Sequence, residues 1–488
     1  MSILDRDLET ARGDEAAISA LHAAFAAQKR AFLANPFPSY EERLAHIGAL
    51  ATMLMSNRER VSKALSEDFG SHPAAASDLI EVLGPASRAQ FAMSRLRDWM
   101  SVEERDIDPA LFGTASASVR QQPKGVIGNI VPWNFPFDLS VGPLIEMLAA
   151  GNRVIIKPSD YTPACAALLS EMIANTFAPD HVTVAVGGLE LAREFPTLSW
   201  DHLLYTGSPH VGREVMLAAA ANLVPVTLEL GGKCPAIVTE DAVDEATVAN
   251  ILGTKMIKNG QMCISVDYVL VPRAKVDTFV NLAKTFMSST VADYSRSGDC
   301  TGIISERHLD RLVRMLQQAR DAGYEVVELE NGGVVDRASR RMPLSLIVNP
   351  GGELDVMHEE IFGPLLPVIA YDSLDEAIGR VNDGERPLGL YVFGYDSTVS
   401  NQVLTQTTSG GACVNVCAMQ GALPSLGFGG SGTSGMGRHH GIEGFREFSN
   451  PRGVVVRGDT GDLVAAFAPP YATAAAIADA AFAPPPQP

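Results

Sequence analysis

The sequence predicts an α/β protein with mostly parallel sheets, and three observations support this fold class. Short apolar runs such as VIGNIVP, RVIIKPS and VTVAVGG alternate with helical patterns from residue 126 onward. This alternation is typical of βαβ units, in which a helix connects two parallel strands. A second alternating stretch runs from PAIVTE at 235–240 to GACVNVC at 411–417. The length of 488 residues favours two or three domains over one core.

Residues 14–104 are expected to be mostly helical. Apolar residues recur there at the spacing of one helix face, for example Leu44, Ile47, Leu50 and Leu54. Because few residue patterns in this region suggest chemistry, we interpret it as a scaffold.

Residues 126–231 are expected to form five strands separated by helices. The chain leaves these strands in the segments NIVPWNF, IIKPSD, AVGG, YTGSPHVG and LELGG. Ligands of mostly parallel sheets bind beyond the carboxyl ends of the strands. These five segments are therefore the first place to look for a site.

Residues 235–417 are expected to form a second α/β region. Its first helix is predicted over 244–258, with Asp244 as the N-cap. The buried face of this helix is predicted to consist of Val248, Ile251, Leu252 and Met256. We expect a cleft between the two α/β regions to hold the site.

The last part of the chain contains two segments of biased composition. The segment GFGGSGTSGMGRHHGIEGF at 427–445 is rich in glycine, which indicates either close backbone approach or a mobile loop. The final stretch, APPYATAAAIADAAFAPPPQP, is biased towards Ala and Pro. It is expected to hold one short helix in an otherwise mobile tail.

The composition is that of an ordinary globular protein, with 46% hydrophobic and 19% charged residues. The 38 basic and 57 acidic residues give a net charge of −19, which argues against a broad contact with nucleic acid or an anionic membrane. The first residues lack a signal-peptide pattern, and no apolar run reaches the ~18 residues of a membrane span. We therefore expect a cytoplasmic protein that acts on a small molecule, without nucleic acid or membrane partners.

Three residues of different chemistry stand out in the predicted α/β regions. Cys263 in KNGQMCIS follows the predicted helix, Glu229 in LELGG ends an apolar strand, and Asn134 lies in PWNFP. Each alone has a structural explanation, as a core thiol, a strand-end acid and a turn amide. Together, a thiol nucleophile, a carboxylate base of raised pKa and an amide for an oxyanion are the groups that oxidise a carbonyl through a thioester. The six cysteines show neither disulfide nor zinc-site spacing, so we expect no metal.

Two further strand ends have the features of a nucleotide site. In YTGSPHVG, Gly207 and Gly212 lie around a helix start, where free amides can face a phosphate. In IIKPSD, Lys157 and Asp160 can hydrogen-bond ribose hydroxyls. A tight turn or a solvated loop charge explains either motif alone, whereas both on one sheet favour a nucleotide.

The motifs, taken in order, resemble the aldehyde dehydrogenase superfamily over almost the whole chain. Six residues carry the resemblance: Asn134 in PWNFP, Lys157 in KPSD, Gly207 in YTGS, Glu229 in ELGGK, Cys263 in GQMC and Glu360 in EEIFGP. The short N-terminal region, the pair Asp267-Tyr268 and the ending SGMGRHHGIEGFREFSN are similar to its class 3 branch. Within that branch the chain most resembles coniferyl-aldehyde dehydrogenases.

The resemblance implies an aldehyde dehydrogenase-like fold with four parts. These are a Rossmann-type NAD(P)-binding domain at 1–103 and 125–231, an α/β catalytic domain at 232–411, a small β bridging or oligomerisation element at 104–124 and 412–456, and a C-terminal tail at 457–488. By the same resemblance the bridging element is expected to join a homodimer.

The resemblance also implies the catalytic roles. Cys263 attacks the aldehyde as a thiolate, while Asn134 and the Cys263 N–H stabilise the oxyanion. Hydride passes to NAD, with NADP as the alternative, and Glu229 activates the water that hydrolyses the thioester.

The cofactor roles follow in the same way. Glu360 is expected to hold the nicotinamide ribose beside Phe362, Lys157 and Asp160 the adenine ribose, and Ser208 the phosphates. The implied cofactor residues are Pro132, Trp133, Lys157, Ser159, Asp160, Gly188, Thr206, Gly207, Ser208, Val211, Leu230, Gly231, Glu360 and Phe362. An apolar substrate pocket for aromatic or medium-chain aldehydes is expected at Phe135, Met262, Phe428 and His440, near Trp133.

The chain departs from the family pattern at four places. Asp160 stands where Glu is usual, which leaves the choice between NAD and NADP open, and Tyr205 replaces Phe. The loop at 421–432 has a small apparent insertion, and Gly427 precedes Phe428 where Pro is usual. Lys258 replaces a common Asn, and two readings apply: its ammonium favours the thiolate, or it complements a helix dipole at the helix end.

Alternative functions use the same residues differently. A CoA-acylating aldehyde dehydrogenase would use Cys263, but a water-activating Glu229 is of no use when a thiol is the acceptor. A cysteine esterase or hydrolase would need a histidine partner, and only His210 lies in a strand-end motif of the nucleotide-type region. A non-catalytic nucleotide-binding protein would not need the complete catalytic set.

Overall fold

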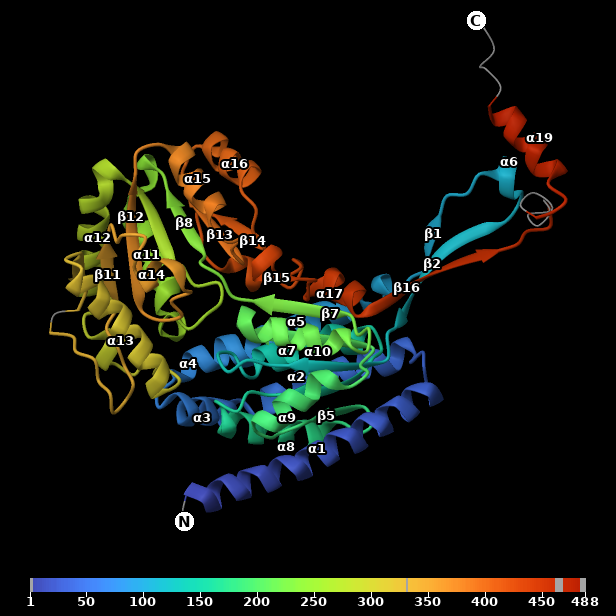
Figure 1. Ribbon diagram of the computed structural model, residues 1–488, viewed down its shortest axis with the longest axis horizontal. Helices are drawn as coiled ribbons and strands as arrows, with labels where there is room; N and C mark the ends of the chain where they lie inside the picture. Colours follow the sequence, from blue (N-terminus) through green and yellow to red (C-terminus); the bar gives the residue numbers. More distant parts are fainter. Residues whose placement is uncertain (1–2, 331, 461–467, 483–488) are drawn as a thin grey trace, which may run out of the picture.

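The computed structural model describes residues 3–330, 332–460 and 468–482 and contains two sheet-centred lobes and an arm (Figure 1). One lobe is built on a six-stranded sheet and the other on a seven-stranded sheet. A three-stranded sheet extends from the lobes as the arm. The predicted α/β class with mostly parallel sheets is confirmed.

The six-stranded sheet has the strand order β15-β7-β6-β3-β4-β5. All five strands predicted between residues 126 and 231 are present and parallel: β3 (Val126–Ile130), β4 (Arg153–Lys157), β5 (Val182–Val184), β6 (His202–Gly207) and β7 (Val226–Leu230). The chain enters in the middle at β3, builds outward through β4 and β5, and returns to the other side of β3 with β6 and β7. This reversal of strand order at β3 is a topological switch point, where ligands of such sheets bind.

Helices cover both faces of this sheet because its strands alternate their apolar side chains between the two faces. Val126 and Ile155 face one core, while Ile127 and Ile156 face the other. The first face carries α1 (Ile3–Ala34), α9 (Leu189–Glu194) and α10 (Pro209–Ala220). The second carries α2 (Tyr40–Ser56), α5 (Gly84–Trp99), α7 (Asp138–Ala149) and α8 (Pro163–Thr176). Between α2 and α5 lie α3 (Arg58–Phe69), α4 (Ala74–Ala76) and the π-helix η1 (Ser77–Leu83).

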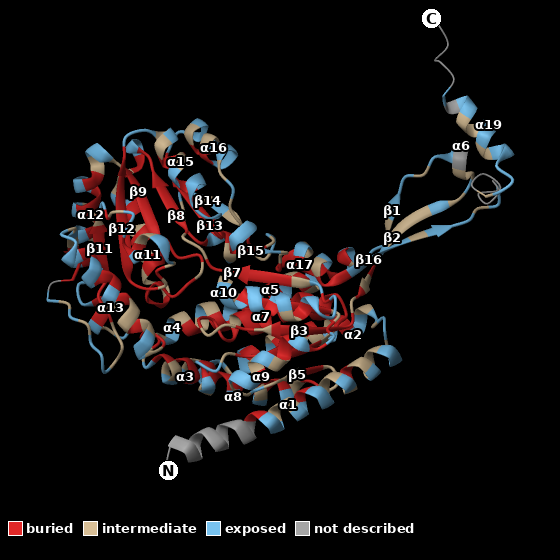
Figure 2. Ribbon diagram, in the orientation of Figure 1, coloured by how far each residue is buried: buried red, intermediate tan, exposed pale blue. Residues whose placement is uncertain are grey.

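The seven-stranded sheet has the order β10-β11-β12-β9-β8-β13-β14, and only β10 runs antiparallel. Its strands are β8 (Pro235–Val238), β9 (Tyr268–Pro272), β10 (Glu325–Glu328), β11 (Ser345–Val348), β12 (Leu365–Tyr371), β13 (Gly389–Phe393) and β14 (Gly411–Val414). One face carries α11 (Glu245–Met256) and α12 (Val276–Thr290). The other carries α13 (Glu306–Asp321), α14 (Asp355–His358), α15 (Leu374–Asp383) and α16 (Ser397–Gln406). The inner strands of both lobes are almost entirely buried, whereas the edge strands β5, β10 and β14 are partly exposed (Figure 2).

Helix α11 begins as predicted and ends two residues earlier than predicted. The Asp244 side chain accepts a hydrogen bond of 2.8 Å from the Thr247 N–H and so caps the helix. After Met256 the backbone turns left-handed, with φ of 47° at Lys258, 55° at Asn259 and 80° at Gly260. A side chain at Gly260 would collide with the carbonyl of Gly363, so this turn requires glycine.

The arm consists of β1 (Glu103–Arg105), β2 (Ser116–Pro123) and β16 (Ser449–Val456), all antiparallel. At its far end lie α6 (Pro109–Phe112) and the tail helix α19 (Ala472–Ala481) (Figure 1). The predicted bridging element extended over 412–456, but much of that range lies in the lobes. There β14 pairs with β13, β15 (Gly435–Met436) pairs with β7, and α17 (Gly441–Glu447) packs on α7, because each completes the edge or face of a lobe.

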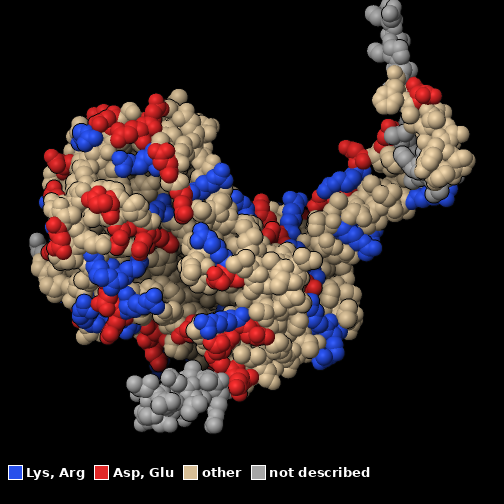
Figure 3. Space-filling view, in the orientation of Figure 1, with Lys and Arg blue, Asp and Glu red and all other residues tan. Residues whose placement is uncertain are grey.

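Charged side chains of both signs occupy the face of the molecule seen in Figure 3. Basic and acidic side chains are interspersed on the visible face, with no broad field of one sign (Figure 3). Within the described ranges, no helix combines the length and apolar character that a membrane crossing requires.

Candidate active site

The predicted site residues line up along the carboxyl edge of the six-stranded sheet. In spatial order, the edge presents Glu229 on β7, Thr206 and Gly207 at the end of β6, Asn134 after β3, Lys157 to Asp160 at and after β4, and Gly188 after β5. Sequence segments separated by up to a hundred residues therefore meet at one edge, as parallel strands dictate.

A cavity of about 710 Å³ opens at this edge and is lined by residues from both lobes. It contains all three predicted catalytic residues, Asn134, Glu229 and Cys263. Of the predicted cofactor residues it contains Pro132, Trp133, Thr206, Gly207, Ser208, Leu230, Gly231, Glu360 and Phe362. The four predicted substrate-pocket residues, Phe135, Met262, Phe428 and His440, also line it.

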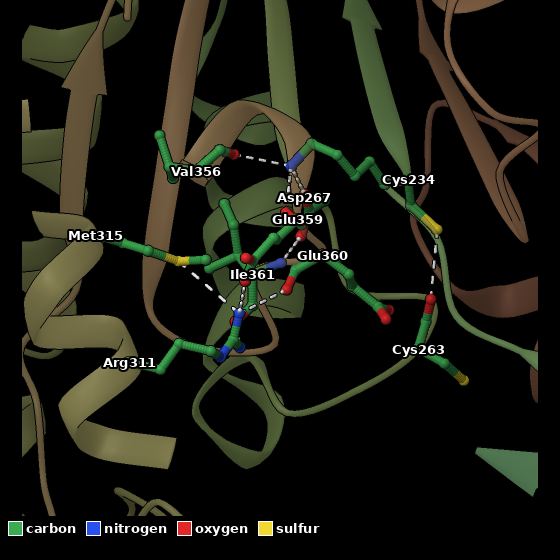
Figure 4. A network of polar contacts seen from close by, with 10 residues as sticks. Cys234, Cys263, Asp267, Arg311, Met315, Val356, Glu359, Glu360 and Ile361 are labelled. Carbon is green, nitrogen blue, oxygen red and sulfur yellow. Dashed lines mark hydrogen bonds and ion pairs between the residues drawn. The ribbon is translucent and has the colours of Figure 1, made fainter. Parts of the chain in front are cut away.

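Cys263 lies in the loop between α11 and β9, five residues after the left-handed turn begins at Lys258. Its carbonyl accepts a hydrogen bond from the Cys234 thiol at 3.4 Å, and its own sulfur is turned away from Cys234 (Figure 4). Its side chain is partly exposed in the cavity wall. Burial in the cavity raises the pKa of the Cys263 thiol, and the carboxylates of Glu360 and Glu229 raise it further.

Asn134 lies in the loop between β3 and α7, and its side chain is 3% exposed. Its amide donates to the Gln261 carbonyl at 3.2 Å, two residues before Cys263. Gln261 is itself fixed, because its side chain donates to the Lys258 and Gly302 carbonyls at 2.9 and 3.0 Å. The amide of Asn134 is thus held beside the loop that carries Cys263.

Glu229 is the penultimate residue of β7 and is 2% exposed. Neither carboxyl oxygen has a hydrogen-bond partner among the described residues. Burial raises its pKa well above the usual value, with a smaller opposing effect from Arg438. A buried carboxyl with free acceptor sites in a cavity is suited to hydrogen-bond a water or substrate there.

Glu360 lies in a loop that backbone hydrogen bonds hold in place (Figure 4). Its carbonyl accepts from the Arg311 guanidinium at 3.0 Å, and the next residue, Ile361, donates its N–H to Asp267 at 2.9 Å. Lys233 pairs with Asp267 and donates to the Glu359 carbonyl at 2.9 Å. These bonds leave the Glu360 carboxyl free to reach the cavity.

The Glu360 carboxyl packs against the backbone of Gly231. A side chain at Gly231 would collide with it, so glycine is required for this close approach. Burial raises the pKa of Glu360 to about 8, and Asp267 contributes to the increase. Next to it, Phe362 adopts a φ of 50° and its ring contacts Trp133 with centroids 5.3 Å apart.

Five predicted cofactor residues lie outside the cavity wall, namely Lys157, Ser159, Asp160, Gly188 and Val211. Asp160 is exposed just beyond β4, and Val211 is in the first turn of α10, whose cap is the Ser208 hydroxyl. The N–H of Gly188 donates to Asp14 of α1 at 2.6 Å, so it is already engaged. Tyr205, which replaces the usual Phe, uses its hydroxyl to donate to the Ser208 carbonyl at 3.3 Å.

The interpretation of the N-terminal helices as a chemically silent scaffold is wrong. Leu79, Ile80 and Leu83 of η1 and Arg88 of α5 line the cavity. Their spacing in the sequence is the same as that of core or surface residues of a helix. They can be recognised as cavity residues only because η1 packs against the cavity. His308 and Arg311 of α13 also line the cavity and carry no sequence motif.

Neither reading of Lys258 anticipated its partner. Its side chain is fully buried and forms an ion pair with Glu81 of the other lobe. Its described hydrogen bonds go to Glu81 and to the backbone of Asn134, not to Cys263.

The two α/β lobes enclose a cavity that holds a cysteine, a buried carboxylate and an amide, an arrangement compatible with an aldehyde oxidoreductase. A family model described as "Aldehyde dehydrogenase family" matches residues 8–454. The chain therefore belongs to the aldehyde dehydrogenase family, whose members oxidise aldehydes with a nicotinamide cofactor.

Individual relatives agree with this assignment. The chain is 43% identical over 437 residues to a Pseudomonas aeruginosa protein named probable coniferyl aldehyde dehydrogenase, covering 90% of this chain and 91% of the relative. It is 41% identical over 449 residues to the coniferyl aldehyde dehydrogenase of Pseudomonas sp. strain HR199, covering 91% and 92%.

Solved structures show the same fold. The substrate-bound Staphylococcus aureus AldH superposes with a TM-score of 0.87 at 32% identity, covering 94% of this chain and 98% of that one. A Mycobacterium tuberculosis aldehyde dehydrogenase complexed with NAD⁺ superposes with a TM-score of 0.81 at 28% identity, covering 91% and 92%.

Proposed function

We propose that the protein oxidises an aromatic or medium-chain aldehyde to the carboxylic acid with NAD, through a thioester on Cys263. The observation that carries this proposal is the convergence of Cys263, Asn134 and the unpartnered carboxyl of Glu229 in one cavity. A thiol, an oxyanion donor and a free buried base are together what this reaction requires.

The roles follow from the positions of the groups. Cys263 loses its thiol proton to water, the thiolate attacks the aldehyde carbon, and the Asn134 amide with the Cys263 N–H stabilises the oxyanion that forms. A nicotinamide held beside Glu360 would accept the hydride from the aldehyde carbon, and the sulfur of Cys263 would then carry the thioester. Glu229 then takes a proton from a water that attacks the thioester carbon, and the acid departs with the thiol restored.

The sheet edge supports binding of a dinucleotide. The turn at Gly207 and the start of α10 present backbone N–H groups beside β6, and Lys157 and Asp160 follow β4. Glu360, packed on Gly231, would hold the nicotinamide ribose. NAD is favoured over NADP because the exposed carboxylate of Asp160 accepts hydrogen bonds from free ribose hydroxyls and repels a 2′-phosphate.

The shape and lining of the cavity support an apolar substrate. Its apolar wall includes residues from η1, α7 and the segment 419–428: Leu79, Ile80, Leu83, Leu139, Met419 and Phe428. Aromatic rings gain most from such a wall because they bury the largest apolar area. The names of the coniferyl aldehyde dehydrogenase relatives are in line with an aromatic aldehyde.

An aldehyde panel run in parallel with NAD and NADP tests the proposal. We expect kcat/KM for benzaldehyde- and cinnamaldehyde-type compounds to exceed that for acetaldehyde and propanal by at least about 10-fold, because each buried methylene adds affinity. NAD should be the better cofactor, and the acid should form without added CoA. Higher kcat/KM for the short aldehydes would reject the substrate class. A requirement for CoA, or ester cleavage without NAD(P) reduction, would favour the alternative functions.

We also infer that the protein is a homodimer joined through the arm. The arm strands have no core of their own, and Val455 and Val456 of β16 are 64% and 54% exposed (Figure 2). Exposed apolar strands of this kind are stabilised by burial against a second chain. Sedimentation should give twice the monomer mass of 51.9 kDa, and a monomer or tetramer would contradict the inference.

A further inference from the structure

Lys258 makes contacts that link the two lobes directly behind the cavity wall at Asn134 and Phe135. Its side chain is 0% exposed, and its ammonium donates to the Glu81 carboxylate and, at 2.5 Å, to the carbonyl of Asn134. The rings of Phe135 and Phe69 lie 4.3 and 5.0 Å from the ammonium and add cation–π attraction. The lysine belongs to the seven-stranded lobe, whereas all four of its partners belong to the other lobe.

Glu81 connects Lys258 to the start of α7 through its two carboxyl oxygens. The carboxyl oxygen that does not meet Lys258 accepts the N–H groups of Phe137 and Asp138 at 3.0 and 2.8 Å. A carboxylate at a helix N-terminus is favoured by the helix dipole and by the free N–H groups there. The loop from Asn134 to Asp138 is therefore fixed at both ends by the Lys258–Glu81 pair.

A second set of hydrogen bonds connects the same loop to the backbone of Lys258 through Gln261. The Lys258 carbonyl accepts the backbone N–H of Gln261 at 3.2 Å and its side-chain amide at 2.9 Å. The carbonyl of Gln261 in turn accepts the Asn134 amide at 3.2 Å. Lys258, Gln261 and Asn134 thus form a closed ring in which one amide hydrogen of Asn134 is occupied and the other remains for the oxyanion.

We propose that Lys258, together with Glu81, is a positioning residue that sets the amide of Asn134 relative to the sulfur of Cys263. This rests on the roles proposed above for Cys263 and Asn134. A buried ammonium must keep its acceptors, because a charge left unpaired away from water is strongly unfavourable. The ring therefore resists displacement and holds the nucleophile loop and the oxyanion donor at one separation.

The substitution Lys258→Met tests the proposal, because Met keeps the volume and loses the donor. We expect the rate constant of the first hydride transfer, followed by NADH absorbance after rapid mixing, to fall about 10- to 100-fold, as for a displaced oxyanion donor. Alkylation of Cys263 by iodoacetamide forms no oxyanion, so its rate should change by less than about 2-fold. Partial unfolding would lower the amplitude of the burst and leave its rate constant unchanged, which separates positioning from stability.

The double variant Lys258→Met with Glu81→Gln controls for the unpaired carboxyl that the single variant leaves. Gln keeps an acceptor for the N–H groups of α7, so we expect the rate constant to stay low. The matched control is Arg43→Met, which removes another buried cation, bonded to the Pro38 and Ala149 carbonyls away from the cavity. It should lower the melting temperature without changing the rate constant of hydride transfer.

Three results would overturn the proposal: a hydride-transfer rate constant unchanged in Lys258→Met, an alkylation rate that falls by the same factor, or a double variant that recovers the wild-type rate. The second result would mean that Lys258 activates the thiol, and the third that an unpaired carboxyl causes the defect. Failure of the proposed function itself is distinguishable, because the wild-type protein would then reduce no NAD(P) with any aldehyde.

Discussion

Replacement of Cys263 by alanine is expected to lower kcat for aldehyde oxidation by at least about 10⁴-fold, because covalent catalysis is lost with the nucleophile. Among the described residues that line the cavity, Cys263 is the one thiol. Binding of NADH, followed by its fluorescence, should be little changed because the sulfur is not among the groups proposed to hold the cofactor. Steady-state NADH formation from a cinnamaldehyde-type substrate measures the loss.

Cys300→Ala is the matched control for this substitution. Cys300 is a fully buried cysteine that does not line the cavity, and its thiol donates to the carbonyl of Thr301 at 3.6 Å. Its variant should retain kcat within about 3-fold. If Cys263→Ala kept more than a tenth of the wild-type kcat, the thioester mechanism would be wrong.

Glu229→Gln is expected to lower the steady-state rate by about 10²- to 10⁴-fold, the usual contribution of a general base. The first turnover should still release one NADH per active site, because the base is needed only for hydrolysis of the thioester. The variant should therefore accumulate an acyl-enzyme, visible by mass spectrometry as Cys263 carrying the acyl group. Glu330→Gln, which changes another buried carboxyl that does not line the cavity, should keep wild-type turnover. Absence of an acyl-enzyme in Glu229→Gln would contradict the role.

The pH dependence of turnover follows from the same carboxyl. Only the ionised form of Glu229 can take a proton from water, and burial raises its pKa well above the ordinary value. The wild-type steady-state rate should thus rise with pH through the raised pKa of Glu229. This rise should disappear in Glu229→Gln, whose side chain does not titrate. If the rate of Glu229→Gln still rose over the same pH range, the rise would belong to another group.

The regular parts of the fold were predictable because their signals are local. Five apolar runs became β3 to β7, and Asp244 caps α11 as its position before a helical pattern predicts. Strand β15 was missed because it is two residues long in a glycine-rich segment and exists only by pairing with β7. The range of the bridging element was too wide for the same reason: the partner of a strand is chosen by residues distant in sequence.

Local sequence segments identified some residues of the site, whereas others could be found only from the tertiary packing. Asn134, Glu229 and Cys263 were found because each lies in a recognisable segment, and the cavity brings all three together. Arg88 and Leu79 were missed because a residue that faces a cavity from a helix has the same pattern as one that faces solvent or core. Gly188 was expected among the cofactor residues, and only the packing of α1 shows that Asp14 accepts its N–H.

The sequence alone therefore determined the strands, the helix starts and the chemical groups of the site, because backbone propensity, capping and residue chemistry act within a few positions of the chain. The tertiary structure alone decided the order of the strands, the wall of the cavity and the partner of each buried charge. Lys258 illustrates the difference. Its side chain is paired with Glu81, 177 positions earlier, and the packing of the two lobes buries both charges, so each needs the other as a partner.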